Sequence, residues 1–286
     1  MRTAFLIAAA LALAFVALVA FGSARWRRAT DVLVARLQAD ARPSAVTHFD
    51  AKELDGLPAP VQRYFRRALH DGATIVRSAR LEHEGEFNLG TDRDLWKPFA
   101  SIQQVRAAPP GFVWHARNFV LPGIAVQVHD AYVDHEGLLH AALLGLWTVA
   151  QVRGGGDFAR DELMRWLAEA AWVPTALLPS QGVRWEAIDE HRARATLRDG
   201  AIEATLDFEF GADDLIAAVR APARGRMVDD RRIPTTWEGR WSRYEQRGGM
   251  WIPITGEVAW LLPEGRKAYW RGTLTAADYD SVPAAR

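Results

Sequence analysis

The sequence predicts an α+β fold, in which one N-terminal transmembrane helix precedes a large, curved antiparallel sheet, half-barrel-like, with a few helices packed on it. Three observations favour this fold. The chain begins with a long uncharged segment, most of the remainder alternates in short strand-like stretches between turn residues, and helical patterns occur in only a few places. Closely spaced strands favour an antiparallel meander over βαβ units, and a sheet of that size must curl or close.

The N-terminal segment has the length and the flanking residues of a membrane anchor. Residues 4–22 carry no charge, and a spanning helix needs roughly 20 apolar residues. Trp26 follows among three arginines, as an interfacial anchor would. The sequence Gly22-Ser23-Ala24 would also suit a cleaved signal peptide, but the long apolar run and the arginines favour an uncleaved anchor.

The predicted organisation has three parts. Residues 1–28 form the anchor with its flanking charges, 29–46 a helical linker, and 47–281 a single α+β domain. This arrangement predicts a single-pass protein of the cell membrane. The basic residues on the two sides of the anchor differ by only about one or two charges, so the positive-inside rule leaves the side of the main domain open.

Helical patterns precede the strands and recur in mid-chain. The residues LPAPVQRY at 57–64 open a helix, and Asp71-Gly72 ends it. In the central stretch, 156–188, a second helix ends at or before Val173 because Pro174 follows. Helices at these places would lie across the concave side of the sheet. The strands are predicted at 76–88, 101–107, 112–119, 124–133, 138–146, 182–188, 192–197, 201–210, 215–220, 235–244, 250–262 and 268–279.

Composition and missing motifs argue against several classes of function. The chain has 35 basic and 35 acidic residues, and this balance gives no long-range attraction for nucleic acid. It has no cysteine, which excludes disulfides and thiolate chemistry. It lacks the GxSxG, GxGxxG, Walker A and HExxH motifs, so no cofactor is predicted. His129, His135 and His140 cluster with acidic residues, but their spacing matches no standard metal site and none is predicted.

Several motifs, in order along the chain, resemble those of a family of bacterial proteins known only as a domain of unknown function. The resemblance covers roughly residues 57–279 and implies no activity. The meander with short helices is also similar in architecture to the half-barrels of bacterial lipoprotein carriers, although this chain has no lipobox cysteine. The motifs are LPAPVQRY at 57–64, GEFN at 85–88, WKPF at 96–99, PGFVW at 110–114, ELMRWLAE at 162–169, PTALLP at 174–179 and GVRW at 182–185.

Tryptophan is the residue type that suggests a binding site. The chain has 12 tryptophans, and each can bury about 150–250 Å². As core residues they need no further function. If the half-barrel opens between sheet and helices, they would instead wall a pocket for a lipid-like or apolar small molecule. The predicted partners are therefore a membrane and such a ligand, and the wall candidates are Trp166, Trp185, Trp237, Trp241 and Trp260.

Two other functions remain open. Glu162 and Glu169 are seven residues apart on one helix face and could serve a hydrolase as an acid/base pair, or they could simply pair with Arg165 or another arginine. A structural or interaction module is the third alternative, and it should expose a large apolar patch. A row of arginines around 220–232, which includes Arg224 and Arg226, could face phosphate groups or form an exposed hairpin.

Overall fold

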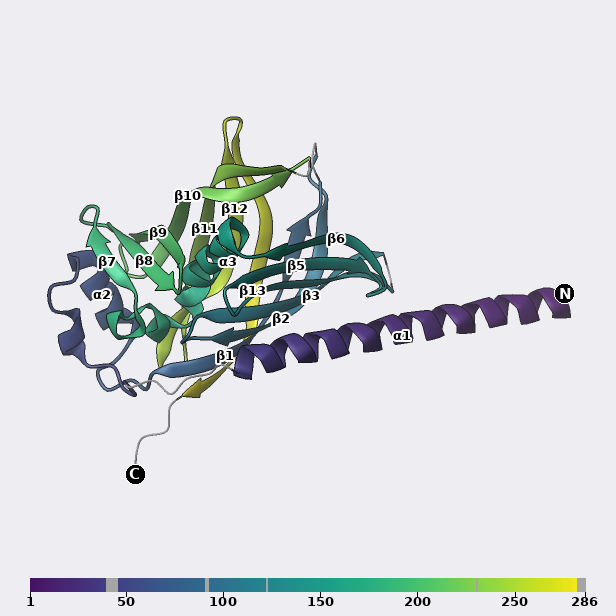
Figure 1. The fold of residues 1–286 in the computed structure, drawn as a ribbon, viewed down its shortest axis with the longest axis horizontal. Coiled ribbons are helices and arrows are strands. Elements are labelled where there is room, and N and C mark those ends of the chain that lie inside the picture. The colour runs from purple at the N-terminus through teal and green to yellow at the C-terminus, as the bar shows by residue number, and fades with distance from the viewer. Residues whose placement is uncertain (40–45, 91–92, 122, 230, 282–286) are drawn as a thin grey trace, which may run out of the picture.

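A computed structural model describes residues 1–39, 46–90, 93–121, 123–229 and 231–281. Its centre is one 13-stranded sheet in which every pair of neighbouring strands is antiparallel. The predicted α+β fold with a curved antiparallel sheet is confirmed (Figure 1). The first half of the sheet consists of β1 (Val76–Asn88), β2 (Trp96–Arg106), β3 (Gly111–Leu121), β4 (Ile124–Val133), β5 (Glu136–Leu143) and β6 (Trp147–Gly154).

The second half of the sheet runs, in chain order, from the edge strand inward to the centre. It consists of β7 (Arg184–Ala187), β8 (Arg192–Asp199), β9 (Ile202–Phe210), β10 (Ile216–Val228), β11 (Arg231–Arg247), β12 (Met250–Leu262) and β13 (Gly265–Ser281). The order is β6-β5-β4-β3-β2-β1-β13-β12-β11-β10-β9-β8-β7, so the two halves meet where β1 pairs with β13. Each half is a plain meander, and the two free edges are β6 and β7.

The helices lie where the strand pattern is interrupted. They are α1 (Arg2–Ala39), α2 (Ala59–Ala68) and α3 (Gly156–Glu169), with short 3₁₀ turns η1 (Ala51–Leu54), η2 (Ala170–Trp172), η3 (Pro174–Leu177) and η4 (Pro179–Gln181). Pro60 lies near the start of α2. Its missing N–H costs no hydrogen bond there, because the N–H groups of the first turn have no partner within the helix. Beyond α3 the chain passes through η2 into η3, which begins at Pro174.

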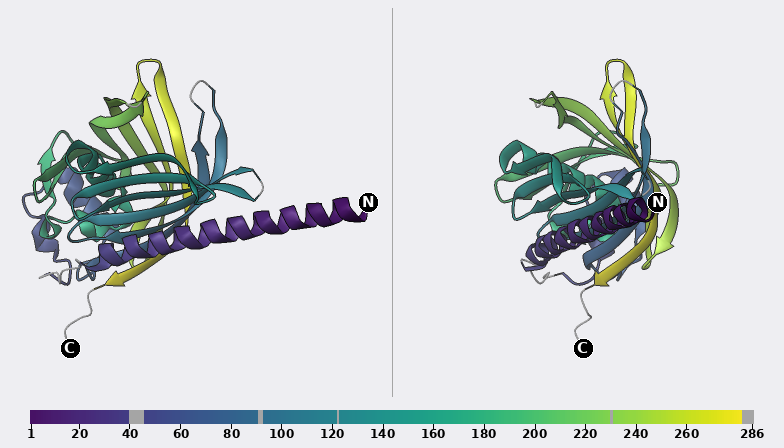
Figure 2. Two further views of the ribbon diagram at one scale, coloured as in Figure 1. Left: turned by 45° about the vertical axis from the view of Figure 1, so that its right-hand side comes forward. Right: turned by 90° about the vertical axis from the view of Figure 1, so that its right-hand side faces the viewer.

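The sheet curls around α3. This helix contacts β9 and β10 in one half of the sheet and β3 to β6 in the other (Figures 1 and 2). The two halves also meet directly, since the Tyr132 hydroxyl of β4 donates to Asp199 of β8 over 2.7 Å. The concave side therefore holds the main core, in which α3 and the 3₁₀ turns pack against the inward-facing strand residues.

Close approach of aromatic rings to the sheet depends on two glycines. A Cβ added at Gly256 would lie 2.5 Å from the Trp241 ring, and one at Gly272 would lie 2.6 Å from Trp270. Both rings thus pack flat against the concave face of the sheet, at positions where any side chain would displace them.

The first helix is continuous across the predicted boundary at residue 28 and runs to Ala39. Its second half packs on the convex face, against β2, β3 and β4. Trp26, predicted at a membrane interface, is only 4% exposed and stacks on His129 of β4 with ring centroids 4.2 Å apart. The first half projects away from the domain with its side chains exposed (Figure 2), and α1 is long and apolar enough to cross a membrane.

One strand was missed by the sequence patterns. β6 is exposed along most of its length, so it shows no alternation of buried and exposed residues. The predicted strands at 215–220 and 235–244 are also longer in the structure, because β10 and β11 continue into a long hairpin.

Candidate functional site

The five candidate tryptophans come from α3 and from strands on both sides of it, and they fall into two groups. Trp166, Trp185 and Trp241 are buried in the core. The indole N–H of Trp166 donates to the Arg106 carbonyl and that of Trp185 to the Leu177 carbonyl, each over 3.0 Å. All three side chains fill the interior, and Trp166 and Trp185 find hydrogen-bond partners there, whereas the Trp241 indole nitrogen is buried without a partner among the described residues.

The second group includes Trp237 and Trp260, which face each other across β11 and β12. The indole N–H of Trp237 donates to the Tyr269 hydroxyl over 2.9 Å. Tyr269 stacks on Trp260 with centroids 5.8 Å apart, and Phe87 lies 5.7 Å from Tyr269. Phe87, Trp260 and Tyr269 are only half buried and pack against the core, so together they form an aromatic surface at its margin. We call these three residues the aromatic platform.

An ionic cluster lies beside these aromatic residues. Arg224 of β10 is buried, lies over the Trp237 ring at 5.1 Å, and pairs with Glu162 of α3 at 3.4 Å. A charge-assisted pair is usually about 2.7–2.9 Å long. The longer distance here suits a Glu162 carboxyl group that is neutral.

Arg165, one turn further along α3, holds the other acidic groups of the cluster. Its guanidinium contacts Asp130 of β4 at 2.5 Å and Glu169 at 2.8 Å, and Gln103 of β2 donates to Glu169 at 2.7 Å. The same guanidinium lies 4.8 Å above the Phe112 ring. Arg165 thus ties α3 to the strand half that contains β2, β3 and β4.

Glu162 and Asp130 form a pair of carboxyl groups that interact inside the protein. Burial raises the pKa of Glu162 well above its usual range, and Asp130 raises it further, whereas Arg224 and Arg165 act in the opposite direction. Glu162 Oε2 and Asp130 Oδ1 are both buried without a donor among the described residues. A proton on Glu162 resolves this, because the neutral carboxyl group can donate to the Asp130 carboxylate.

The structure thus brings Glu162 and Glu169 into one cluster, joined through Arg165, and pairs each with an arginine. Sequence spacing put the two glutamates on one helix face, but it did not reveal Asp130 as the closer partner of Glu162. That residue comes from a distant strand, and only the curl of the sheet brings it to α3.

Arg226 lies two residues beyond Arg224 on β10 and shares its face of the strand. Among the residues that the structure describes, it forms no ion pair, and its Nε atom is buried without a partner. The next arginine on that hairpin, Arg232, is fully used by Asp161, with two contacts of 2.8 Å. Arg226 is therefore a cation on the β10–β11 hairpin with no acidic partner in the described structure.

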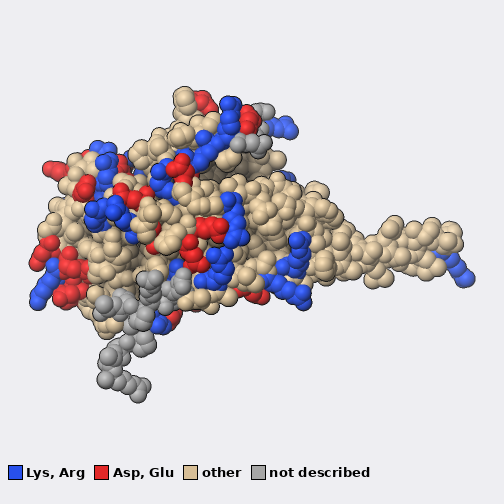
Figure 3. Space-filling model, in the orientation of Figure 1, with Lys and Arg blue, Asp and Glu red and all other residues tan. Residues whose placement is uncertain are grey.

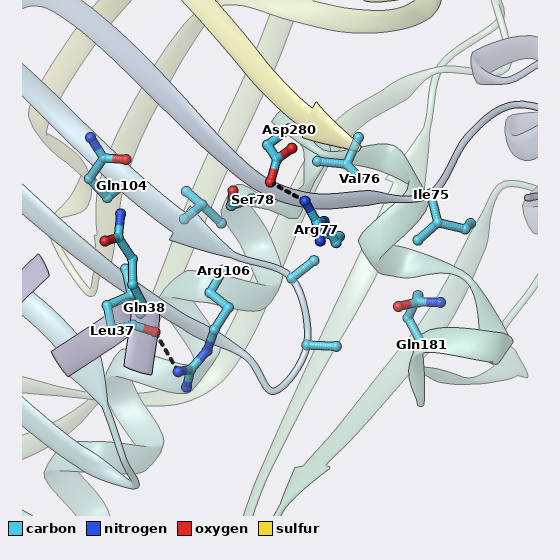
Figure 4. Close-up of a pocket in the computed structure, with 13 residues that line it drawn as sticks. Leu37, Gln38, Ile75, Val76, Arg77, Ser78, Gln104, Arg106, Gln181 and Asp280 are labelled. Atoms are coloured by element: carbon cyan, nitrogen blue, oxygen red, sulfur yellow. Dashed lines mark hydrogen bonds and ion pairs between the residues drawn. The ribbon is translucent and has the colours of Figure 1, made fainter. Parts of the chain in front are cut away.

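A cavity lined by other residues lies elsewhere. It has a volume of about 350 Å³ and lies at the lower ends of β1 and β2, next to Leu37 and Gln38 of α1 (Figure 4). Arg77 points to Asp280 on one side of it, and Arg106 bonds the Leu37 carbonyl on the other. Residues 40–45 connect the two described segments that flank this cavity and lie outside the described residues, so we assign no ligand to it.

The sequence predicted no standard metal site at the three histidines on β4, in the following turn and on β5. His129 stacks on Trp26 and contacts Thr30 at 2.7 Å, His140 contacts Thr148 at 3.0 Å, and His135 pairs with Asp199. No group of three or more metal-ligating side chains is found in the described part of the chain.

The sequence matches a family of unknown function (DUF6920) over residues 55–279. The chain belongs to this family. The resemblance predicted from the motifs is thereby confirmed, and the family description assigns no activity. Among curated proteins, none matches the chain significantly.

Two solved structures are similar over most of their length. A LolA superfamily protein, NE2245 from Nitrosomonas europaea, is 9% identical, covers 84% of this chain and 96% of its own, and has a TM-score of 0.41. A beta-barrel-like protein of the domain of unknown function DUF1849 from Brucella abortus is 11% identical, covers 72% of this chain and 99% of its own, and has a TM-score of 0.20. These scores are low, and nothing about function is inferred from them.

Proposed function

We propose that this protein is a membrane-anchored binding protein that holds an amphipathic, lipid-like ligand at the aromatic platform of its half-barrel. The observation that carries the proposal is the half-buried set of Phe87, Trp260 and Tyr269, with Arg226, which has no acidic partner among the described residues, on the adjacent β10–β11 hairpin. Stacked rings offer apolar contact area to an acyl chain. A guanidinium without a partner suits a carboxylate or phosphate headgroup.

The anchoring part of the proposal depends on α1. Figure 3 shows the projecting half of the helix without charged residues between Arg2 at its tip and the basic residues at the domain. Its side chains are exposed to solvent along this length, which a soluble protein would rarely tolerate over so large an apolar area. A bilayer would cover them.

Ligand binding has more support than hydrolysis by Glu162 or Glu169. Both carboxyl groups are paired with arginines, and the Glu162 carboxyl group is buried in the core. The cavity of Figure 4 and the groove between α1 and the sheet are lined by other described residues. The raised pKa of Glu162 would suit a general acid, but a substrate needs a route to it.

Quenching of tryptophan fluorescence by a brominated fatty acid tests this function on the full chain in detergent. Trp260→Phe should remove a large share of the quenching, because Trp260 would contact the ligand. Trp251→Phe is the matched control, since Trp251 is also half buried on β12 but stacks under Arg67.

The headgroup contact is tested by the same titration with Arg226→Gln. Loss of a hydrogen bond to a charged group costs about 1.5–3 kcal/mol, so the fatty acid should bind roughly 10- to 100-fold more weakly. Arg231→Gln, an exposed neighbour on the same hairpin, should bind as the wild type does. Equal quenching in all variants would contradict the proposed site.

A further inference from the structure

We propose that the end of the domain formed by the β3–β4 hairpin and the β5–β6 turn is a second membrane contact, which inserts into the bilayer that α1 crosses. This inference rests on the anchoring part of the proposed function. It adds a docking surface and fixes which end of the domain faces the lipid.

Exposed apolar side chains gather at this end of the domain. Leu121 at the end of β3 is 60% exposed, Trp147 at the start of β6 is 53% exposed, and Val149 is 60% exposed. Neither the stretch 118–126 nor the stretch 141–152 contains a charged residue. Exposed tryptophan beside uncharged apolar residues is typical of the interfacial region of a membrane.

The position of this surface follows from its contact with α1. The β5–β6 turn packs against Gly22, where an added Cβ would lie 2.2 Å from the Leu144 carbonyl oxygen and 2.9 Å from the Leu146 side chain. Gly22 is the last residue of the apolar run that begins at Ala4, and the first charged residue after it is Arg25. The turn therefore meets α1 at the level where the helix leaves the hydrocarbon region.

The β3–β4 hairpin reaches further. Val126 of β4 pairs with Leu143, just before the β5–β6 turn, and β3 and β4 remain paired as far as Leu121 and Ile124. The Leu144 N–H of the turn donates to the Ala125 carbonyl, so the paired strands extend past this level by one residue, or about 3.3 Å. Figures 1 and 2 show these strands running alongside α1, with their ends directed towards its N-terminus. Leu121 and Ile124 would thus lie at a depth where lipid begins to cover apolar side chains.

Cationic side chains lie on the domain side of the apolar ones, at the level where lipid headgroups would be. Arg117 of β3, four residues before Leu121, is exposed and lines the same groove as Ser23 and Arg27 of α1. Arg25 is exposed on the same turn of the helix. These side chains can extend to phosphate groups while the hairpin tip enters the apolar layer. In Figure 3 the surface from this end of the domain to the tip of α1 is largely without acidic residues.

Because the chain contains no cysteine, single cysteines can be introduced and labelled with an environment-sensitive fluorophore. We would compare Leu121→Cys and Val149→Cys with two references in the full chain, reconstituted in phosphatidylcholine vesicles with and without phosphatidylglycerol. Leu13→Cys reports the span itself. Ile188→Cys, next to the β7 edge, reports an exposed apolar residue on the other half of the sheet.

The expected result is a blue shift and loss of emission by a lipid-attached quencher at 121, 149 and 13, but not at 188. If only position 13 is quenched, the anchor stands and the docking surface is wrong. If no position is quenched, the anchoring itself fails. A blue shift at 121 and 149 without lipid quenching would show that protein, such as a second copy, covers this surface, and would overturn the proposal.

Discussion

Glu162 is the residue whose environment departs most from what its chemistry prefers. It is 4% exposed, it lies beside Asp130, and its only ion pair among the described residues is the long contact with Arg224. Removing one partner of a buried charged pair is usually costly, because the other charge remains buried. The neutral form of Glu162 avoids part of that cost, and the cluster then needs only Asp130 and Glu169 to balance Arg165 and Arg224.

This state of Glu162 predicts a pH dependence of folding. The unfolded pKa of a glutamate is about 4.3, and the folded pKa is raised. Between the two values the folded state binds more protons, so its stability is full below about pH 4.3 and falls as the pH rises towards the folded pKa. Glu162→Gln, which keeps a donor for Asp130, should remove this decline.

Chemical denaturation across a pH series measures the effect. The exposed Glu190→Gln serves as the control and should keep the wild-type profile. If Glu162→Gln also follows the wild-type profile, the carboxyl group is not held neutral in the fold.

At the same scale, the tryptophans show what the sequence could and could not reveal. Their number suggested a core or a pocket wall, and of the five candidates Trp166, Trp185, Trp237 and Trp241 are buried. Residue spacing could not distinguish the burial of Trp241 on β11 from that of Trp260 on β12. The Trp241 ring covers Gly256 in the core, whereas Trp260 remains half buried. That difference depends on how far each strand extends beyond α3, which no local pattern encodes. Arg226 was visible as part of an arginine row, but its lack of an acidic partner was not.

Among the elements, α1 connects the proposed membrane to the sheet. Trp26 and Thr30 both contact His129, and Leu37 packs with Val113 and Ala131 on the convex face. Burial, and then His115 and His140, lower the pKa of His129 to about 3. His129 is thus neutral at physiological pH while the helix is docked, which suits its stacking on the indole ring.

Trp26→Ala should release the second half of α1 from the sheet without unfolding the sheet. Replacing a buried tryptophan by alanine costs about 3–5 kcal/mol, a loss that Leu33, Val34 and Leu37, the other apolar contacts of this half of the helix, must offset for it to stay docked. Hydrogen exchange should then increase at residues 23–37 and remain low in β13. The pKa of His129, followed by NMR, should rise towards its ordinary value of about 6.5 as the ring becomes hydrated.

Arg27→Ala, on the exposed neighbour of Trp26, should change neither reading. Unchanged exchange at 23–37 in Trp26→Ala would mean that other contacts hold the helix. The predicted interfacial role of Trp26 came from its arginine neighbours, and the histidine partner that buries it lies about 100 residues away in the chain.

Local patterns also explain which elements were found. Long strands with one buried face, such as β9 and β12, alternate clearly and were predicted near their observed positions. The edge strand β6 has two exposed faces and was missed. Its exposed Trp147 and Val149 become meaningful only once the fold places the neighbouring β5–β6 turn against α1.

In the whole molecule, a single sheet curls until its two halves meet around α3. Arg165 and Asp130 tie that helix to one half, Arg224 and Glu162 tie it to the other, and Tyr132 with Asp199 joins the halves directly. This closure encloses the core around α3. The aromatic platform remains half buried at the margin of that core. The sequence predicted the curved sheet from strand count, but the closure depends on long-range ion pairs that strand patterns do not contain.

The central claim is that a lipid-like molecule occupies the aromatic platform. A fatty acid carrying a photoreactive diazirine in its chain, irradiated with the full-length protein in vesicles, tests this most directly. Labelling of α1 by membrane-dissolved probe provides an internal reference. We predict additional adducts on peptides containing Phe87, Trp260 and Tyr269, reduced by competition with unlabelled fatty acid. Adducts confined to α1 and to the hairpin end of the domain, with none at the platform, would contradict the account.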